Sequence, residues 1–192
     1  GQDIAQVSIS SLRQAIGGVQ QDPFLFTAAV DHNVAYADPS AGMDQIVQAS
    51  TDAQIHSFIE ELPKNYQTLV GEDGVSLSGG QKQRISIARG TLTDAPILIF
   101  DDATAAIDAG TEQYIRRALK ERAGTHTTII ISHRLVSMMH ADEILFLDEG
   151  RIVERGTHKQ LLALRERYFA LHSLQLRDEN QLAPLNEQIE PA

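Results

Sequence analysis

The sequence contains no cysteine, and none of its apolar runs approaches the ~20 residues that a helix needs to cross a bilayer. Without cysteine the chain can form neither disulfides nor thiolate metal sites. The N-terminus also lacks the basic start and the apolar stretch of a signal peptide. These absences fit a globular protein of a reducing compartment.

Basic residues are scarce relative to acidic ones, with 16 Lys and Arg against 26 Asp and Glu and a formal net charge of −10. Proteins that bind nucleic acids normally present a basic face, so we expect no nucleic-acid partner. Hydrophobic residues make up 42% of the 192 residues, which is an ordinary share for a globular protein with one core.

Short apolar runs alternate with helical patterns along much of the chain, which predicts an α/β fold. Runs made of Ile, Leu and Phe are typical of strands that are buried on both faces of a largely parallel sheet. Strands are expected at residues 16–20, 97–101, 127–132 and 143–147, and helices at residues 80–92, 111–122 and 135–140. Asp148-Glu149-Gly150 predicts a hairpin turn, and two helices should follow Gly156.

The segment from residue 27 to residue 92 has a mostly helical pattern, with a loop at residues 64–78. One apolar stripe at helical spacing consists of Ala53, Ile55, Phe58, Ile59 and Leu62. A single helix is expected there, with Thr51 or Asp52 as its cap and Pro63 as its stop.

The most informative string is Leu77-Ser78-Gly79-Gly80-Gln81, which opens the helix expected at residues 80–92. The N-terminus of a helix carries free N–H donors and about half a unit of positive charge, and glycine lets a phosphate approach the backbone. An isolated Gly-Gly pair is more often only a tight connection. Because Ser78 precedes the pair and Lys82 and Arg84 follow it, we interpret the string as an anion site.

Two carboxylates, Asp101 and Asp102, come directly after the apolar run at residues 97–100. Ligands of parallel α/β sheets bind at the carboxyl ends of the strands. A carboxylate there can hold Mg²⁺, directly or through water, and the next one can orient an attacking water. A solvated turn is the alternative interpretation.

His133 follows the second apolar run, at residues 127–132, and is expected at the same edge of the sheet. A histidine alone more often satisfies local hydrogen bonds, so only its position favours a function. Gln21 is the weakest candidate, because a glutamine before Asp-Pro is usually a loop residue. We include Gln21 among the candidate site residues only because the other motifs occur in the same chain.

These motifs, in this order, resemble the nucleotide-binding domain of an ATP-binding cassette (ABC) transporter of the exporter type. The resemblance runs from Gly1 to about Leu174. The signature motif is matched by Leu77–Gln81, the Walker B strand by Ile97–Asp101, the D-loop by Ala105–Asp108, the switch-histidine loop by Ser132–Arg134, the Q-loop by Gln20–Asp22, and the exporter loop by Val70–Gly74 with Asp73 in place of Arg.

The resemblance implies the P-loop NTPase-like fold of ABC ATPases, which is a mostly parallel sheet with an inserted helical subdomain. It divides the chain into residues 1–26 as partial ATPase core with the Q-loop, 27–92 as helical signature subdomain, 93–176 as ATPase core with Walker B, D-loop and switch histidine, and 177–192 as a flexible tail.

The resemblance also implies an ATPase that works as a head-to-tail dimer, with ATP and Mg²⁺ at the interface. Asp102 and His133 would be catalytic, Asp101 and Gln21 would hold Mg²⁺, and the nucleotide would contact Ser78, Gly79, Gly80, Gln81, Gln21 and Asp108. The partners would be a second nucleotide-binding domain, homologous or identical, and the transmembrane domain of the transporter. The site would then lie at the cytoplasmic face of the plasma or inner membrane.

Two features depart from the family pattern. The phosphate-binding motif Gly-x-x-x-x-Gly-Lys-Ser/Thr is absent, and in the family it lies upstream of the segment that resembles Gly1–Arg13. We therefore expect an N-terminally truncated chain that is inactive alone and binds ATP poorly. Asp102 stands where the family has a glutamate, which resembles the slow site of heterodimeric exporters and predicts low turnover.

Two alternatives remain open from the sequence. One is a soluble ABC ATPase of DNA repair or translation, although neither a coiled-coil insertion nor a basic face is visible. The other is a non-catalytic remnant that only dimerises with another cassette, which a nucleotide-binding assay on the chain would distinguish.

Overall fold

The structure, a computed structural model, describes residues 2–71, 74–104, 106–121 and 126–186, with side chains as far as Arg177. The chain forms two compact units, Gly1–Ser132 and His133–Ala192, and each is described by itself. No helix within the described ranges is long and apolar enough to cross a membrane.

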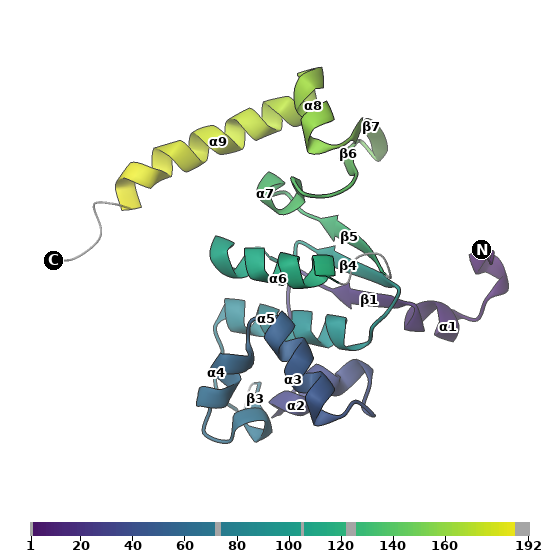
Figure 1. Cartoon of the computed structure of the whole chain (residues 1–192), viewed down its shortest axis with the longest axis vertical. Coiled ribbons are helices and arrows are strands. Elements are labelled where there is room, and N and C mark those ends of the chain that lie inside the picture. The colour runs from purple at the N-terminus through teal and green to yellow at the C-terminus, as the bar shows by residue number, and fades with distance from the viewer. Residues whose placement is uncertain (1, 72–73, 105, 122–125, 187–192) are drawn as a thin grey trace. The chain divides into compact units, whose positions relative to one another are not determined.

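The first unit combines a small sheet with a group of helices (Figure 1). Its strands are β1 (Ile16–Val19), β2 (Ala28–Ala29), β3 (Leu69–Val70), β4 (Ile97–Asp101) and β5 (Thr127–Ile131). Its α-helices are α1 (Ile9–Gln14), α2 (Val30–Val34), α3 (Met43–Asp52), α4 (His56–Glu61), α5 (Gly79–Leu92) and α6 (Ala109–Glu121), and its 3₁₀ turns are η1 (Ile4–Gln6), η2 (Ala35–Ala37) and η3 (Asn65–Gln67).

The main sheet is parallel and has the strand order β1-β4-β5, which confirms the α/β fold with a parallel sheet. Val19 pairs with Phe100, and Asp101 pairs with Ile131. All three strands therefore end at the same edge, where Gln20 follows β1 and Ser132 follows β5. The expected strand at residues 97–101 has the bounds of β4.

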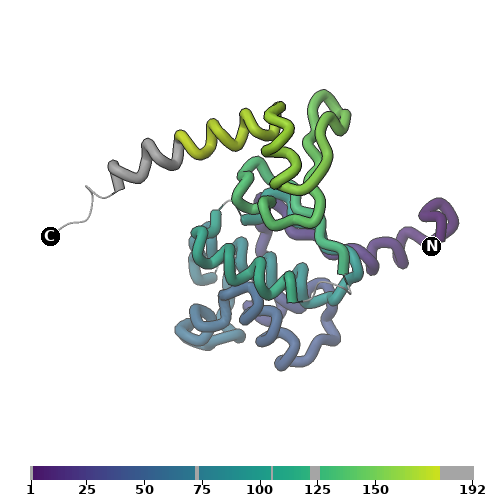
Figure 2. The backbone as a smooth tube through the Cα atoms, turned by 45° about the horizontal axis from the view of Figure 1, so that its top comes forward, coloured from purple at the N-terminus to yellow at the C-terminus, as the bar shows by residue number. Residues whose placement is uncertain are grey.

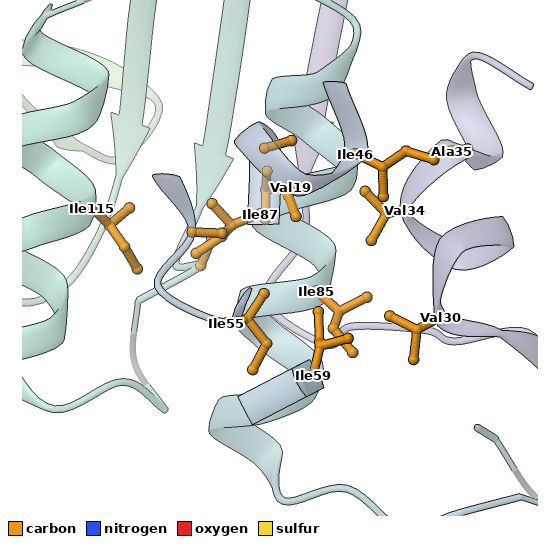
Figure 3. Close-up of a cluster of buried hydrophobic side chains, with 14 of the residues drawn as sticks. Val19, Val30, Val34, Ala35, Ile46, Ile55, Ile59, Ile85, Ile87 and Ile115 are labelled. Carbon is orange, nitrogen blue, oxygen red and sulfur yellow. The ribbon is translucent and has the colours of Figure 1, made fainter. Parts of the chain in front are cut away.

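Helix α5 lies between the sheet and helices α2, α3 and α4 (Figure 1). Figure 3 shows Ile85 and Ile87 of α5 among apolar side chains from the surrounding elements, and both are almost completely buried. The close packing of α5 on β1 depends on Gly90, because a Cβ there would lie 2.6 Å from Cγ2 of Val19. The helix that begins at the glycine string is thus buried in the core over most of its length, while Gly79 and Lys82 of its first turn are exposed.

The predicted start of the helix over the stripe from Ala53 to Leu62 is wrong. Thr51 and Asp52 end α3 instead of capping a helix, and α4 begins at His56. Gln54 has a φ of 56°, and this left-handed conformation interrupts the helical path between α3 and α4.

The second unit contains α7 (Leu135–Met138), β6 (Ile144–Asp148), β7 (Arg151–Gly156), α8 (His158–Leu164) and α9 (Arg167–Asn186). Strands β6 and β7 form the expected antiparallel hairpin, and Figure 2 follows the chain from it into α8 and α9. Glu149 and Gly150 adopt positive φ angles at the turn. A small core of its own is formed by Leu135, Ile144, Leu161 and Tyr168.

The tail expected from Arg177 onward differs from the structure, because α9 continues to Asn186. Residues such as Glu179, Gln181 and Leu182 have high intrinsic helix propensity, which a search for apolar periodicity does not register. Residues 187–192 lie outside the described part of the chain. The structure separates only two units, and their boundary between Ser132 and His133 falls inside the expected segment 93–176. The division of the chain into four parts therefore stays a prediction.

Candidate functional site

The glycine string forms the N-terminus of α5, with Ser78 as its N-cap. The N–H of Gln81 donates to Ser78 Oγ at 3.3 Å, and the N–H of Ser78 donates to Gln81 Oε1 at 2.8 Å. This reciprocal capping box fixes the first turn. The N–H groups of Gly79 and Gly80 have no acceptor within the helix, because first-turn donors lie ahead of its hydrogen-bond ladder. The tip therefore offers main-chain donors at the positive end of the helix dipole.

The tip packs against the segment that precedes α6. A Cβ on Gly80 would lie 2.9 Å from the carbonyl oxygen of Ala106, whereas a Cβ on Gly79 would come no closer than 4.0 Å to the Ala106 side chain. Glycine at position 80 is therefore required by a close backbone approach. Position 79 has room for a side chain.

Asp108 and Arg84 place opposite charges beside this tip. Asp108 Oδ1 accepts a hydrogen bond of 2.9 Å from the N–H of Thr111, and hydrogen bonds from Thr111 lower the pKa of Asp108, with a further contribution from the charge of Arg84. Burial lowers the pKa of Arg84, and the charge of Asp108 opposes that shift. Arg84 Nη1 also donates to the carbonyl of Gln54 at 2.6 Å. The structure thus brings the signature string and Asp108 together in one unit.

The two strand-end carboxylates differ in their surroundings. Asp101 is exposed at the end of β4, whereas Asp102 is half-buried. The N–H of Asp102 donates to the carbonyl of Ile131 at 2.7 Å, and Ser132 Oγ donates to Asp102 Oδ1 at 3.2 Å. Asp102 has a φ of 47°, a left-handed conformation that is uncommon outside glycine. Both its backbone and its side chain are therefore fixed by the end of β5.

Gln21 is exposed in the loop that follows β1. The β1–β4 register continues from the Val19–Phe100 pair, so Gln20 lies level with Asp101 and Gln21 comes one residue beyond. One carboxylate and one amide oxygen at neighbouring strand ends fit the oxygen ligands of Mg²⁺. The described residues include no group of three or more His, Cys, Asp or Glu side chains that could hold a metal ion. The donor set suits an ion that keeps several waters and takes substrate phosphate oxygens.

Two residues of α5 that sequence reasoning missed hold the backbone of this loop. Gln83 Nε2 donates to the carbonyl of Gln20 at 3.0 Å, and Arg89 Nη1 donates to the carbonyl of Phe24 at 3.0 Å. Gln83 is only 1% exposed. A long polar side chain at a buried helix position is the signal that could have identified it.

His133 is the first residue of the second unit and is exposed there. Its carbonyl accepts a hydrogen bond of 2.6 Å from Gln175 Nε2, and Gln175 Oε1 accepts one of 3.0 Å from the N–H of Leu135. Gln175 of α9 thus fixes the backbone around His133. The approach of His133 to Asp102 stays a prediction.

Parts of two motifs fall outside the described residues. These are Glu72 and Asp73 of the loop at residues 70–74 and Ala105 of the segment at residues 105–108. In the described parts of these motifs, Val70 belongs to β3, and Ala106 and Asp108 lie beside the tip of α5.

Comparison with known proteins gives a consistent result. The family model described as "ABC transporter" matches residues 1–105. The uncharacterized ABC transporter ATP-binding protein YknU of Bacillus subtilis is 49% identical over 175 residues, which cover 91% of this chain and 30% of that protein. An ATP-dependent lipid A-core flippase of Legionella pneumophila is 45% identical over 98% of this chain and 31% of its own length.

A solved structure of a bacterial Atm1-family ABC exporter with ATP bound is similar to this chain, with a TM-score of 0.87 and 44% identity. The match covers 91% of this chain and 31% of that chain. The sequence therefore spans about 30% of the length of the curated relatives that it matches.

Proposed function

Because this chain belongs to the ABC transporter family, we propose that it is part of an ATP-binding and ATP-hydrolysing cassette that powers export of a substrate across a membrane. The observation that carries the proposal is the capped glycine tip of α5, packed beside Asp108 in the unit that holds the strand-end carboxylates. Two of the proteins named above are a lipid A-core flippase and an Atm1-family exporter, which favours transport over DNA repair or translation.

The tip of α5 completes a site whose other half comes from a second cassette, homologous or identical to this one. The N–H groups of Gly79 and Gly80 donate to the terminal phosphate of an ATP molecule that is held mainly by that partner. The Ser78 and Gln81 side chains stabilise the first turn through their capping hydrogen bonds, so the donors are in place before the anion binds. The helix dipole adds attraction for negative charge.

The strand ends act on the ATP molecule of this chain's own cassette. Asp101 and Gln21 would hold Mg²⁺, and the ion would neutralise phosphate charge there. Asp102 orients the attacking water, and His133 contacts the terminal phosphate. The transmembrane domain belongs to the same full-length protein, so the cassette works at the cytoplasmic face of the membrane.

Turnover at this site is low because Asp102 is shorter than the glutamate of the family pattern. Its hydrogen bonds to Ile131 and Ser132 keep it from moving toward the water to compensate. A positioned general base contributes about 10²–10⁴-fold to a rate, so misplacement can remove much of that factor. The 192-residue chain alone binds ATP weakly, since it has no Gly-x-x-x-x-Gly-Lys-Ser/Thr loop to hold the phosphates.

The experiment that tests the proposal compares two substitutions at one position in the full-length protein, reconstituted in membranes. Gly79→Ala fits the space beside Ala106 and should keep most of the ATPase rate. Gly79→Asp is favourable for the helix, because an acid stabilises a helix N-terminus, but its charge repels the triphosphate. For Gly79→Asp we expect unchanged thermal stability and an ATPase rate at least tenfold lower than that of Gly79→Ala. Equal ATPase rates in the two variants would contradict the proposed role of the tip.

A further inference from the structure

We propose that Gln83 is a positioning residue that fixes the loop carrying Gln21, and that it ties this loop to the phosphate-binding tip of the same helix. The inference rests on the proposed function, because it concerns the Mg²⁺ ligand Gln21. Neither the motifs in the sequence nor the named relatives assign a role to Gln83.

The burial of Gln83 is the first observation. Its side chain is 1% exposed and belongs to the helix that also carries the core residues Ile85 and Ile87. Burying an amide is unfavourable unless its polar atoms find partners. Among the residues that the structure describes, Gln83 Oε1 has no hydrogen-bond partner. Within that part of the chain, the amide is therefore held by the bond from Nε2 to the carbonyl of Gln20, at 3.0 Å.

The position of that bond is the second observation. Gln20 directly precedes Gln21, so a bond to its carbonyl restricts the peptide plane that joins the two residues. Arg89 gives a second attachment on the other side of Gln21, because its Nη1 donates to the carbonyl of Phe24 at 3.0 Å. The loop is thus held by one helix on both sides of Gln21.

The rigidity of Arg89 supports this attachment. Arg89 Nε donates to the carbonyl of Asn33 at 2.8 Å, and its guanidinium lies 5.7 Å from the ring centre of Phe26 and 5.6 Å from that of Tyr36. A guanidinium held by hydrogen bonds and aromatic rings cannot follow a moving loop. The Phe24 carbonyl is therefore attached to a fixed point.

The distance along α5 is the third observation. Gln83 comes about one helical turn after Gly79, and a turn of α-helix rises about 5.4 Å. A helix that is buried and intact transmits displacement over one turn without bending. The tip serves the ATP molecule of the partner cassette, while Gln21 serves the site of its own cassette. Gln83 thus mechanically joins the two nucleotide sites that one chain contributes to.

The test uses Gln83→Met in the full-length protein, because methionine fills a similar volume without a donor. Gln113→Met, at an exposed position of α6, is the matched control. Hydrogen exchange of the nucleotide-free, metal-free protein should become faster for peptides covering residues 20–24 in Gln83→Met and not in the control. With ATP present, the affinity for Mn²⁺, measured by electron paramagnetic resonance, should fall about three- to tenfold, the range that one net hydrogen bond supports.

A second mutation separates positioning from general destabilisation. In a Gln21→Ala background the metal ligand is already lost, so Gln83→Met should cause no further fall in Mn²⁺ affinity. If Gln83→Met does not fold, Arg89→Lys replaces it, because lysine keeps the charge but cannot reach both Asn33 and Phe24 in the same way. Unchanged exchange and unchanged Mn²⁺ affinity would overturn the inference, and so would an equal fall in the Gln21→Ala background.

The outcome for the proposed function is read separately. If the wild-type protein does not hydrolyse ATP with Mg²⁺, the proposed function fails whatever the variants do. If it hydrolyses ATP and Gln83→Met leaves residues 20–24 and Mn²⁺ binding unchanged, only the inference about Gln83 fails.

Discussion

Replacement of Gly90 by alanine tests how tightly α5 packs on the sheet. Two effects oppose each other in this substitution. Alanine in a helix interior is favoured over glycine by about 1 kcal/mol. The new Cβ, however, would lie 2.6 Å from Cγ2 of Val19, which is 2% exposed and β-branched. Such a side chain has little freedom to rotate away, and overpacking a core typically costs about 1–3 kcal/mol.

The cost of overpacking exceeds the gain in helix propensity, so we expect Gly90→Ala to lower the free energy of unfolding by about 1 kcal/mol. Urea unfolding of the purified chain, followed by circular dichroism, measures this as a lower midpoint at constant m-value. The control is Gly18→Ala on the adjacent strand, where a Cβ would meet no atom within 4 Å. That variant should stay within about 0.5 kcal/mol of the parent.

A double-mutant cycle shows whether the collision with Val19 is the cause. Val19→Ala removes the methyl group that Gly90→Ala would meet, so the two changes together should cost about 2 kcal/mol less than the sum of the single effects, which is the collision cost itself. A stabilised Gly90→Ala variant, or strict additivity in the cycle, would refute the reasoning that this glycine is required by close packing.

Three further results are expected. Ser78→Ala removes one half of the capping box at α5 and should lower the free energy of unfolding by about 1 kcal/mol, measured in urea. Asp102→Glu, in the full-length protein with its partner, should raise ATP turnover, and an unchanged rate would count against Asp102 as the cause of low activity. The pKa of His158 is lowered from its ordinary value of 6.5 by burial and by the nearby His172 and His140. Because the folded chain then binds protons less readily than the unfolded chain, stability should be full above pH 6.5 and should decline as pH falls through the lowered pKa. A His158→Gln variant should lose this acid dependence in thermal unfolding.

Much of the sheet could be predicted from the sequence because its signal is local. The run Ile97–Phe100 and the two aspartates after it set both the bounds of β4 and the position of its carboxyl end. The start of α5 was likewise predicted to within one residue, at residue 80, although the capping box of Ser78 and Gln81 was not predicted. Such features depend on residues that are near one another in the chain.

The remainder could not be predicted because it depends on conformation or on tertiary contacts. The break between α3 and α4 comes from the left-handed conformation of Gln54, for which an ordinary glutamine gives no warning. The bond from Ser132 to Asp102 requires the register of two strands, and the bond from Gln83 to Gln20 joins residues that are far apart in the sequence. Side chains of this kind are found only once the packing is known.

The mutual capping of Ser78 and Gln81 has a thermodynamic consequence for anion binding. Both side chains are hydrogen-bonded to the main chain of the first turn, and Gly80 lies close to the carbonyl of Ala106. A phosphate that reaches the tip therefore has no disordered turn to organise, and little conformational entropy is lost at that moment. The anion is bound by main-chain N–H groups whose positions are set before it arrives. The affinity of this tip for phosphate should therefore depend more on whether the first turn of α5 is formed than on the chemistry of any single side chain.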